Sequence, residues 1–229
     1  MFKKLFMLFK IGRKLATSGA TSSIYEIYNP PIVIKILFFV IGFSFNDKKN
    51  NNNLSPGIKL CNALQGMGTT FIKLGQFLAT RPDIIGKDIA KELEKLQDKL
   101  PPFQLGEAKN ILREELGKEN FSKIINFSDS IAAASIAQVH FATISNSTEK
   151  REVAIKILRP NIEKIFNDEL DALMLLAYIS QSLIKKTKRL KLVEVVQLLR
   201  EITNVEMDLR FEAAAANELK ENTKNDIGF

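Results

Sequence analysis

Lys156 ends an apolar run, residues 153–156, that has the composition of a β-strand and is the first candidate for chemistry. A run of small residues, 132–137, precedes it, and a helical segment that carries Glu212 follows it. A phosphate chain is well bound by a cation that a rigid strand holds, and a nearby carboxylate fixes the position of that cation. An apolar strand with one lysine is common, so the three features together, rather than Lys156 alone, favour a phosphate site.

Lys73 and Gln76 form a second candidate pair. They are three residues apart, so a helix places them on one face, and Gly75 between them lets another backbone approach closely. Taken alone, a lysine and a glutamine on a helix are far more often solvated than functional. Their position beside an apolar stripe is what favours a role for them.

Cysteine and histidine counts exclude several kinds of site. Cys61 is the single cysteine, which excludes an internal disulfide and a multi-cysteine zinc or iron–sulfur site. His140 is the single histidine, which excludes metal binding by a histidine pair. No metal ligands are therefore predicted among the side chains, and Cys61 is interpreted as an inert core residue. A hydrophobic content of 45% with 26% charged residues is that of an ordinary globular protein.

The net charge of +7 is confined to the first quarter of the chain. Residues 1–60 carry nine Lys or Arg against two acids, whereas residues 61–229 are balanced. A basic protein of this kind is a poor candidate for nucleic-acid binding, which requires a basic face on the folded domain. The cluster of cations in 185–191 is interpreted as a solvated turn at the end of a helix. We therefore expect no nucleic-acid partner.

The first 45 residues are predicted to form a segment that associates with a membrane. Phe2, Leu5, Phe6 and Phe9 follow helical spacing with cations between them, which suits a helix at a membrane interface. An amphipathic helix docked on the rest of the protein explains the pattern equally well.

A second apolar run, 32–45, falls short of the roughly 20 residues that span a bilayer. We interpret it as a buried or interfacial helix. The polar stretch 46–57 is predicted to be a linker.

Apolar periodicity predicts five helices after this linker. The expected ranges are 60–79, 87–99, 104–116 (ended by Gly117), 162–184 and 192–222. Between the third and fourth helices, period-two alternation and polar turns predict an antiparallel meander of three strands over residues 127–158. Helices and an antiparallel sheet in separate blocks indicate the α+β class.

The sequence resembles the UbiB-type atypical kinase-like family, which supports ubiquinone biosynthesis. The run 153–156 matches the strand-lysine motif of protein kinases, but the loop that is glycine-rich in kinases is alanine-rich here. The matching motifs are Lys73-Leu74-Gly75-Gln76 (KxGQ), Ala79-Thr80-Arg81-Pro82-Asp83, Leu96-Gln97-Asp98-Lys99, the Ala-rich loop and following strand 132–140, Arg159-Pro160, Glu206-Met207-Asp208 (ExD), and Glu212 at the helix-C glutamate.

The resemblance implies which residues form the site and which cofactor they bind. It places catalytic roles on Lys73, Gln76, Lys156, Glu206, Asp208 and Glu212, and nucleotide binding on Ala132, Ala133, Ala134, Ser135, Ile136, Ala137 and Lys156. The expected cofactor is ATP or ADP with Mg²⁺. KxGQ helices in this family fold over the nucleotide site, which implies slow hydrolysis or phosphorylation of a small molecule rather than of proteins.

Two ion pairs are predicted from these motifs, one between Lys156 and Glu212 and one between Lys73 and the ExD acids. Glu206 and Asp208 are two residues apart, about 200° around a regular helix, so both cannot face one lysine. Either the helix is irregular at Met207 or the second acid has another partner. We expect Lys73 to contact at least one of the two acids, with Glu206 preferred because Asp208 can face the same side as Glu212.

The expected domain organisation has a helical KxGQ extension at 58–126, packed on a kinase-like small lobe at 127–229. The family's large lobe, with its catalytic and metal-binding acids, is absent from the sequence. In one reading the chain is the N-terminal part of an atypical kinase or ATPase and is inactive alone. In the other it is a non-catalytic scaffold of a quinone-synthesis complex. Expected partners are nucleotide, quinone-synthesis proteins or prenylated lipid precursors, and a membrane surface, at the cytoplasmic face of a membrane such as the bacterial inner membrane.

Overall fold

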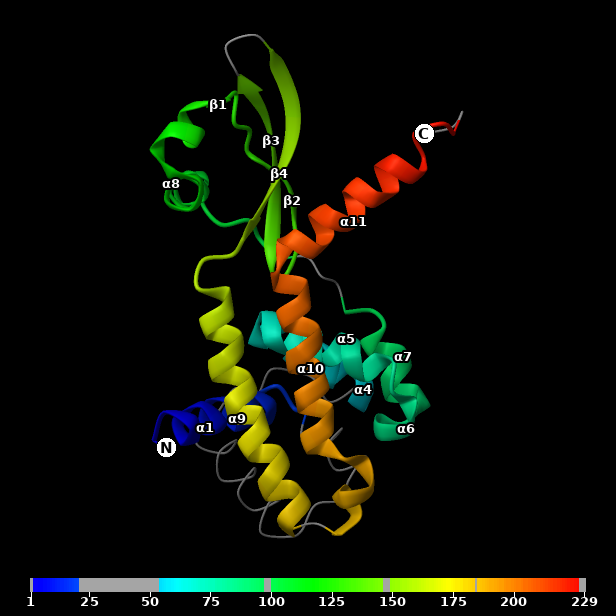
Figure 1. Ribbon diagram of the computed structural model, residues 1–229. Helices are drawn as coiled ribbons and strands as arrows, with labels where there is room; N and C mark the ends of the chain where they lie inside the picture. Colours follow the sequence, from blue (N-terminus) through cyan, green and yellow to red (C-terminus); the bar gives the residue numbers. More distant parts are fainter. Residues whose placement is uncertain (1, 21–53, 97–99, 146–148, 184, 227–229) are drawn as a thin grey trace.

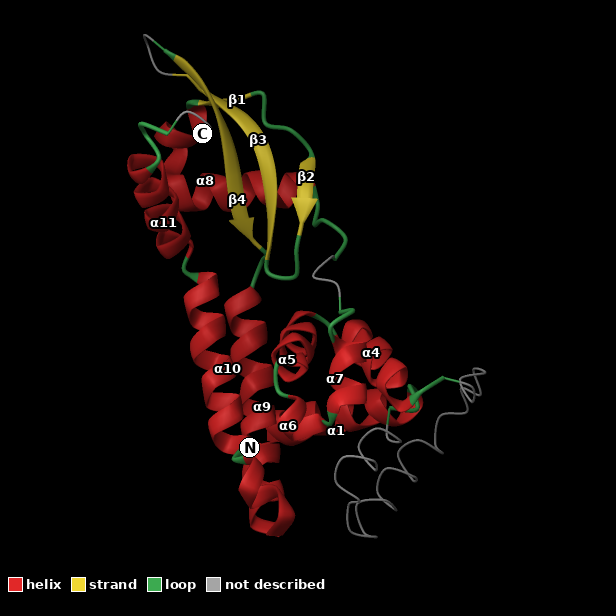
Figure 2. Cartoon of the chain, turned by 90° about the vertical axis from the view of Figure 1, so that its right-hand side faces the viewer, coloured by secondary structure: helices red, strands yellow, loops and turns green. Residues whose placement is uncertain are grey.

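The computed structural model describes residues 2–20, 54–96, 100–145, 149–183 and 185–226. A small antiparallel sheet forms one end of the molecule and a group of helices forms the other (Figure 1). Two long helices, α9 (Ile162–Leu183) and α10 (Leu192–Met207), run side by side and lead away from the sheet (Figure 2). The α+β class expected from the sequence is confirmed.

The sheet is built around one long central strand, β3 (Ala137–Ser145). The strand β4 (Lys150–Leu158) pairs with it along its whole length, from Ala137 opposite Leu158 to Ser145 opposite Lys150. On the other side of β3, β2 (Ser130–Ala133) pairs with one end and the short β1 (Ile124–Ile125) pairs with the other. The predicted meander is confirmed, with β1 added to it.

One face of the sheet is covered by α8 (Leu105–Ser122). Ala108 and Leu112 of this helix are buried with Ile157 of β4 in a small apolar core. Gly117 has φ 74°, which kinks the helix at the position where the sequence predicted its end, and helical structure then continues to Ser122.

The helix predicted over 60–79 is in fact two helices, α4 (Pro56–Met67) and α5 (Thr69–Ala79). Gly68 separates them with φ 108° and ψ −172°, a backbone conformation that glycine adopts without a steric penalty. The apolar stripe continues through the break because both helices pack on the same core, which includes Leu64 and Phe71. The polar linker is also shorter than predicted, since Ser55 caps α4 and residues 56 and 57 are helical.

The helix predicted over 87–99 is also shorter. Two helices, α6 (Pro82–Ile85) and α7 (Lys87–Leu93), meet at Gly86, and α7 ends six residues before the expected end. Leu96 nevertheless remains buried with Leu93 in the core, so its apolar spacing reflected packing rather than helix length. Residues 97–99 lie outside the described residues.

The prediction of one helix over 192–222 is wrong. α10 ends at Met207, and α11 (Leu209–Asn222) begins after Asp208, whose φ of −87° and ψ of 89° are not helical. The Asp208 side chain accepts a hydrogen bond from the Arg210 backbone N–H, which is the N-cap interaction that aspartate favours. The helix α11 consequently leaves the axis of α10, starting at the base of the sheet and leading outward from it (Figure 1).

The basic residues 185–191 fall mostly in a 3₁₀ helix, η1 (Lys185–Leu190), which joins α9 to α10. The predicted turn between these helices is thus a short helical turn in the described structure. Lys188, Arg189 and Lys191 are exposed, as a solvated connection requires.

The first helix, α1 (Phe2–Thr17), is docked on the protein through one face and open on another. Ile11 is buried in the helical core, and α1 packs against α9 and α4. Leu5, Phe6 and Phe9 are 47%, 71% and 49% exposed. The second apolar run, 32–45, and most of the linker lie outside the described residues. No helix in the described part of the chain is long and apolar enough to span a membrane.

The larger apolar core is formed mainly by the helices α1, α4 to α7, α9 and α10. Its most buried large side chains are Leu93, Phe166, Leu170 and Leu199. The packing therefore groups α8 with the sheet and groups α9 and α10 with the KxGQ helices. This division differs from the sequence boundary expected between residues 126 and 127.

Candidate functional site

Lys156 and Glu212 form an ion pair between β4 and the first turn of α11. The Lys156 Nζ lies 2.5 Å from the Glu212 Oε2, and the two side chains are 34% and 60% exposed. The helix break at Asp208 sets the direction of α11, whose first turn carries Glu212 to Lys156. The predicted Lys156–Glu212 contact is confirmed as geometry.

Lys156 lies on the sheet face opposite α8. Lys156 on β4 lies opposite Val139 on β3. Because side chains alternate along a strand, Phe141 of β3 and Ala154 of β4 lie on the same face as Lys156. Phe141 is 58% exposed and Ala154 is also exposed. Ile155 and Ile157 point to the other face, where they pack with α8. A fixed cation therefore stands beside open apolar surface on one side of the sheet.

The Ala-rich run, residues 132–137, forms the end of β2, a tight turn and the start of β3. The Ala134 N–H donates to the Ala137 carbonyl across 2.8 Å and closes the turn. Ser135 and Ala137 are almost completely buried, and Ile136 inserts into the helical core rather than into the small core of the sheet. The loop therefore connects the sheet with the KxGQ helices.

Lys73 pairs with Glu206, as the sequence predicted. Its Nζ lies 2.9 Å from the Glu206 Oε2, which joins α5 to the end of α10, and the side chains are 16% and 37% exposed. The pair is partly shielded, which excludes the solvated interpretation of Lys73. Gln76 is half-buried one turn further along α5, and its functional role stays a prediction.

Gly75 in the same motif packs closely against two leucine side chains. A Cβ at this position would come within 2.2 Å of a Leu96 methyl group and 3.0 Å of a Leu64 methyl group. Neither contact is compatible with an unshifted neighbour. The sequence suggested that another backbone would approach Gly75, whereas the structure places side chains of α4 and of the segment after α7 there.

Asp208 has a partner other than Lys73. It accepts hydrogen bonds from the Arg210 Nε at 2.8 Å, the Arg210 Nη2 at 2.6 Å and the Arg210 backbone N–H. The guanidinium lowers the pKa of Asp208, chiefly through the side-chain hydrogen bond. Both alternatives raised by the ExD spacing hold, because the helix is irregular and the second acid is bound elsewhere. Asp208 shapes the backbone that delivers Glu212.

Sequence reasoning gave no role to the residues that hold the Ala-rich loop. The Arg159 Nε and Nη2 donate to the Ala134 carbonyl at 3.0 and 2.8 Å, and the Thr69 Oγ1 donates to the Ser135 carbonyl at 3.0 Å. Arg159 was noted only as part of a family motif. Thr69 follows Gly68, and a glycine before two threonines in an apolar helix pattern was the available signal of a break.

His140 is a buried structural residue of β3. It is fully buried, stacks on Phe127 with ring centroids 4.5 Å apart, and contacts Gln138 and the Ser128 carbonyl through its ring nitrogens. Gln138 in turn bonds the Phe103 backbone. Cys61 is buried as expected, and burial raises the pKa of its thiol, which keeps it protonated and unreactive.

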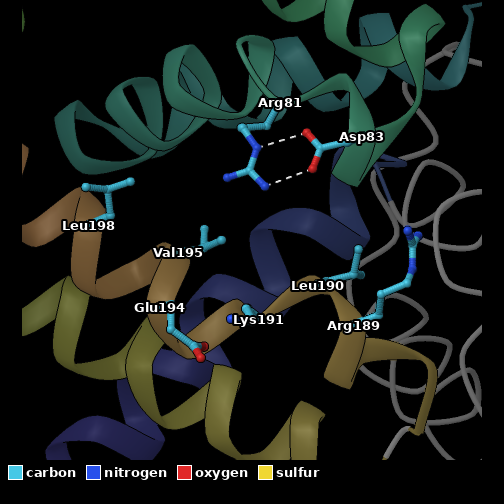
Figure 3. A pocket seen from close by; sticks show the side chains of 8 residues that line it. All are labelled: Arg81, Asp83, Arg189, Leu190, Lys191, Glu194, Val195 and Leu198. Carbon is cyan, nitrogen blue, oxygen red and sulfur yellow. Dashed lines mark hydrogen bonds and ion pairs between the residues drawn. The ribbon is translucent and has the colours of Figure 1, made fainter.

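Two hollows outside the Lys156 face have mixed charge. One, of about 190 Å³, lies at the start of α10, where Arg81 and Asp83 form a two-point ion pair above Val195 and Leu198 (Figure 3). The other, of about 350 Å³, lies at the opposite end of α10 beside Asp208. In the first hollow Arg81 is bound to Asp83, with Arg189 and Lys191 also in the lining, and in the second Arg210 is bound to Asp208.

Comparison with known proteins identifies relatives over most of the chain. This chain is 37% identical over 196 residues to "Probable protein kinase UbiB" of Marinobacter nauticus. The matched region covers 85% of this chain and 35% of the relative. It is 39% identical over 170 residues to the protein of that name from Pseudomonas aeruginosa, and 38% over 173 residues to that from Cellvibrio japonicus. These matches cover 74% and 75% of this chain.

The chain spans about a third of the length of these relatives. Its described residues contain the small lobe and the helices packed on it but no large lobe. The family model described as "ABC1 atypical kinase-like domain" matches residues 95–229, which include the Ala-rich loop, Lys156, Glu206 and Glu212. The chain therefore belongs to the ABC1 atypical kinase-like family, and within it to the UbiB type.

Proposed function

We propose that this chain provides the nucleotide-facing part of a UbiB-type atypical kinase or ATPase that supports ubiquinone biosynthesis. The observation that carries the proposal is the Lys156–Glu212 ion pair on an open sheet face, next to the Ala-rich loop. A lysine fixed on a strand by a carboxylate is the arrangement that holds the α- and β-phosphates of a nucleotide in protein kinases.

Each part of the site has a distinct role in this proposal. Lys156 binds the phosphates, and Glu212 keeps its ammonium group in place. Phe141 and Ala154 offer exposed apolar surface beside Lys156 on which a base can rest. The Ala-rich loop closes one end of the site, and Lys73 with Glu206 holds the KxGQ helix against it. The ligand is ATP or ADP, with Mg²⁺ bound to its phosphates.

Nucleotide binding by the 229-residue chain is expected to be weak, and turnover is expected to be absent. Among the described residues, no group of three or more His, Cys, Asp or Glu side chains could hold a metal ion. Asp208 of the ExD motif is engaged by Arg210, and Glu212 is paired with Lys156. In this proposal the metal-binding acids belong to the part of the relatives' length that this chain does not span.

The test is a nucleotide titration followed by NMR amide shifts at millimolar ADP or ATP with Mg²⁺. Lys156→Ala should abolish the shifts around the Ala-rich loop. Lys150→Ala is the matched control, since Lys150 is an exposed lysine on the same face at the far end of β4, and it should leave binding unchanged. Equal binding by both variants would contradict the proposed site. Magnesium-dependent hydrolysis by the chain, lost in Lys156→Ala, would contradict its expected inactivity.

A second candidate function is a non-catalytic scaffold bound to the cytoplasmic face of a membrane. The observation in its favour is α1, which docks through Ile11 and leaves Leu5, Phe6 and Phe9 exposed near the exposed cations Lys10 and Arg13. Apolar residues beside cations suit the surface of an anionic membrane. The partners of such a scaffold would be quinone-synthesis proteins or prenylated lipid precursors.

Co-sedimentation with vesicles tests this candidate. The chain should bind anionic vesicles more than neutral ones, and the binding should weaken as salt is raised. The double variant Phe6→Ser, Phe9→Ser should lose binding, whereas Phe211→Ser, which changes an equally exposed phenylalanine on α11, should keep it. Equal recovery with neutral and anionic vesicles at low salt would contradict the electrostatic part of the proposal.

A further inference from the structure

Asp208 is the single residue between α10 and α11, and its backbone is bonded to both helices. Its N–H donates to the Val205 carbonyl of α10 at 3.2 Å, and its carbonyl accepts from the Phe211 N–H of α11 at 3.1 Å. Its φ of −87° and ψ of 89° are not helical, so the helix axis changes direction here (Figure 1). The end of α10 is fixed to α5 by the Glu206–Lys73 pair. The direction of α11 therefore depends on what keeps Asp208 in this conformation.

Arg210 supplies three donors to the Asp208 carboxylate. The Arg210 backbone N–H and Nε donate to Oδ1 at 3.1 and 2.8 Å, and Nη2 donates to Oδ2 at 2.6 Å. These bonds hold the carboxylate in the N-cap position of α11, where the capping residue has a non-helical backbone. In a continuous helix the Arg210 N–H would instead donate to the Glu206 carbonyl, four residues back. The bonds from Arg210 therefore favour the broken helix over the continuous one.

Apolar packing does not fix the direction of α11. No residue of this helix is buried in the described structure, and Phe211 and Leu219 are 60% and 54% exposed. The apolar spacing of the sequence predicts one helix over 192–222, so a continuous helix is the alternative that the local pattern supports. The polar contacts of its first turn therefore decide the direction of α11.

We propose that Arg210 is a positioning residue of the nucleotide site and acts through Glu212. Arg210 holds Asp208 in the capping conformation, and this conformation sets the direction of the first turn of α11. The Glu212 carboxylate in that turn then meets Lys156. Glu212 fixes the lysine that binds the phosphates, whereas Arg210 determines where Glu212 lies. The inference rests on the nucleotide site proposed above.

The first measurement is the angle between α10 and α11 in the nucleotide-free chain, obtained from amide residual dipolar couplings. Arg210→Met removes the guanidinium but keeps a long side chain, and it should change or average this angle. Asp208→Asn keeps an N-cap acceptor but removes the charge, so it should have a similar effect. Arg210→Lys keeps the charge and should retain the original angle in part. The matched control is Lys220→Met, which removes an exposed cation in the last turn of α11 and should leave the angle unchanged.

The second measurement is ADP binding in the presence of Mg²⁺. The affinity for ADP falls in proportion to the population of chains in which Glu212 lies at Lys156. Arg210→Met should therefore weaken ADP binding roughly two- to fivefold, the range for loss of an exposed ion pair, and Lys220→Met should not. Because Arg210 acts through Glu212, Arg210→Met should cause no further loss when Glu212→Ala is already present.

The outcomes separate this inference from the proposed function. A changed angle and weaker ADP binding in Arg210→Met, with no further loss in the Glu212→Ala background, support it. An unchanged angle in both Arg210→Met and Asp208→Asn overturns the claim that Arg210 holds the break. A changed angle with unaltered ADP binding, or an equal loss of binding with and without Glu212, overturns the positioning role and leaves the nucleotide site in place. If the unsubstituted chain shows no ADP-dependent shifts, the proposed function and the positioning role fail together, whereas the angle in Arg210→Met still tests what holds the break.

Discussion

The helical region and the sheet region of this protein differ in how they are stabilised. The helices α1, α4 to α7, α9 and α10 share one continuous core, in which Leu93 and Phe166 are fully buried. The sheet region has a core of three buried residues, and α11 has no buried residue at all within its described length. Lys156 and Glu212 nevertheless lie in the less buried region.

This difference indicates a division of labour. The helical region has the larger buried apolar core, whereas the sheet region exposes charged and apolar groups, which the proposed function assigns to nucleotide binding. The Ala-rich loop is attached to the helical core by Ile136, which inserts into that core, and by the hydrogen bond from Thr69 to the Ser135 carbonyl. The position of the Ala-rich loop in the sheet region is therefore set by its contacts with the helical region.

Truncating one leucine in each core should give the largest and clearest contrast. Leu93→Ala leaves a cavity among helices that are fixed on several sides, so the free energy of unfolding should fall by about 3–5 kcal/mol. Leu112→Ala affects the small core, which can collapse around the gap, and should lower it by about 2–3 kcal/mol. Urea unfolding followed by circular dichroism measures both. Equal losses would mean that the two cores are equally constrained.

Breaking the Lys73–Glu206 pair should have an intermediate effect. Lys73→Met leaves the Glu206 carboxylate partly buried without its cation, and the pair's limited exposure places the expected loss at about 1–3 kcal/mol, between exposed and buried ion pairs. Lys123→Met is the control, since Lys123 pairs with Glu119 on the surface of α8 and should change stability by less than about 0.5 kcal/mol. A double-mutant cycle with Glu206→Gln that shows no coupling would mean that the pair does not join α5 to α10.

The sequence was sufficient for the elements that depend on local pattern. Alternation over 137–158 predicted the strands, and the resemblance to the UbiB family predicted that Lys156 pairs with Glu212 and Lys73 with an ExD acid. It failed where one residue changes the backbone direction within a continuous apolar pattern. Gly68 and Asp208 each divide a predicted helix, because hydrophobic periodicity records which side of the chain is buried and not where a helix is interrupted.

The hydrogen bonds that hold the Ala-rich loop could not be predicted from the sequence, for a different reason. Thr69 and Ser135 are 66 residues apart, and Arg159 bonds carbonyls of residues 100, 101 and 134. Backbone carbonyls carry no sequence signature, so a side chain that recognises them cannot be found from residue types. The same holds for Gln138, whose amide bonds the backbone of Phe103.

The pH dependence of the helical region offers a smaller effect. Glu169 of α9 faces Thr70 of α5 and lies near Lys10, Lys14 and Asp168. Its pKa is raised above the ordinary value of 4.5, chiefly by desolvation. A folded-state pKa above the unfolded one means that stability is lost as the pH rises through the folded value. Glu169→Gln should therefore raise the melting temperature at pH 7, and the gain should disappear below pH 4.5. A gain that persists at low pH would point to packing rather than ionisation.

The smallest effect on stability is expected from Lys156→Met, although it removes the central group of the proposed site. Its partner Glu212 is 60% exposed, so water solvates the carboxylate that remains, and an exposed pair contributes about 0–1 kcal/mol. The urea midpoint should be nearly that of the unsubstituted chain, while ADP binding is lost. Lys73→Met provides the contrast, since it should lower stability and affect nucleotide only through the position of α5. A Lys156→Met variant that unfolds as readily as Leu112→Ala would show that the pair holds α11 and the sheet together, and the two regions would then not divide stability and ligand binding between them.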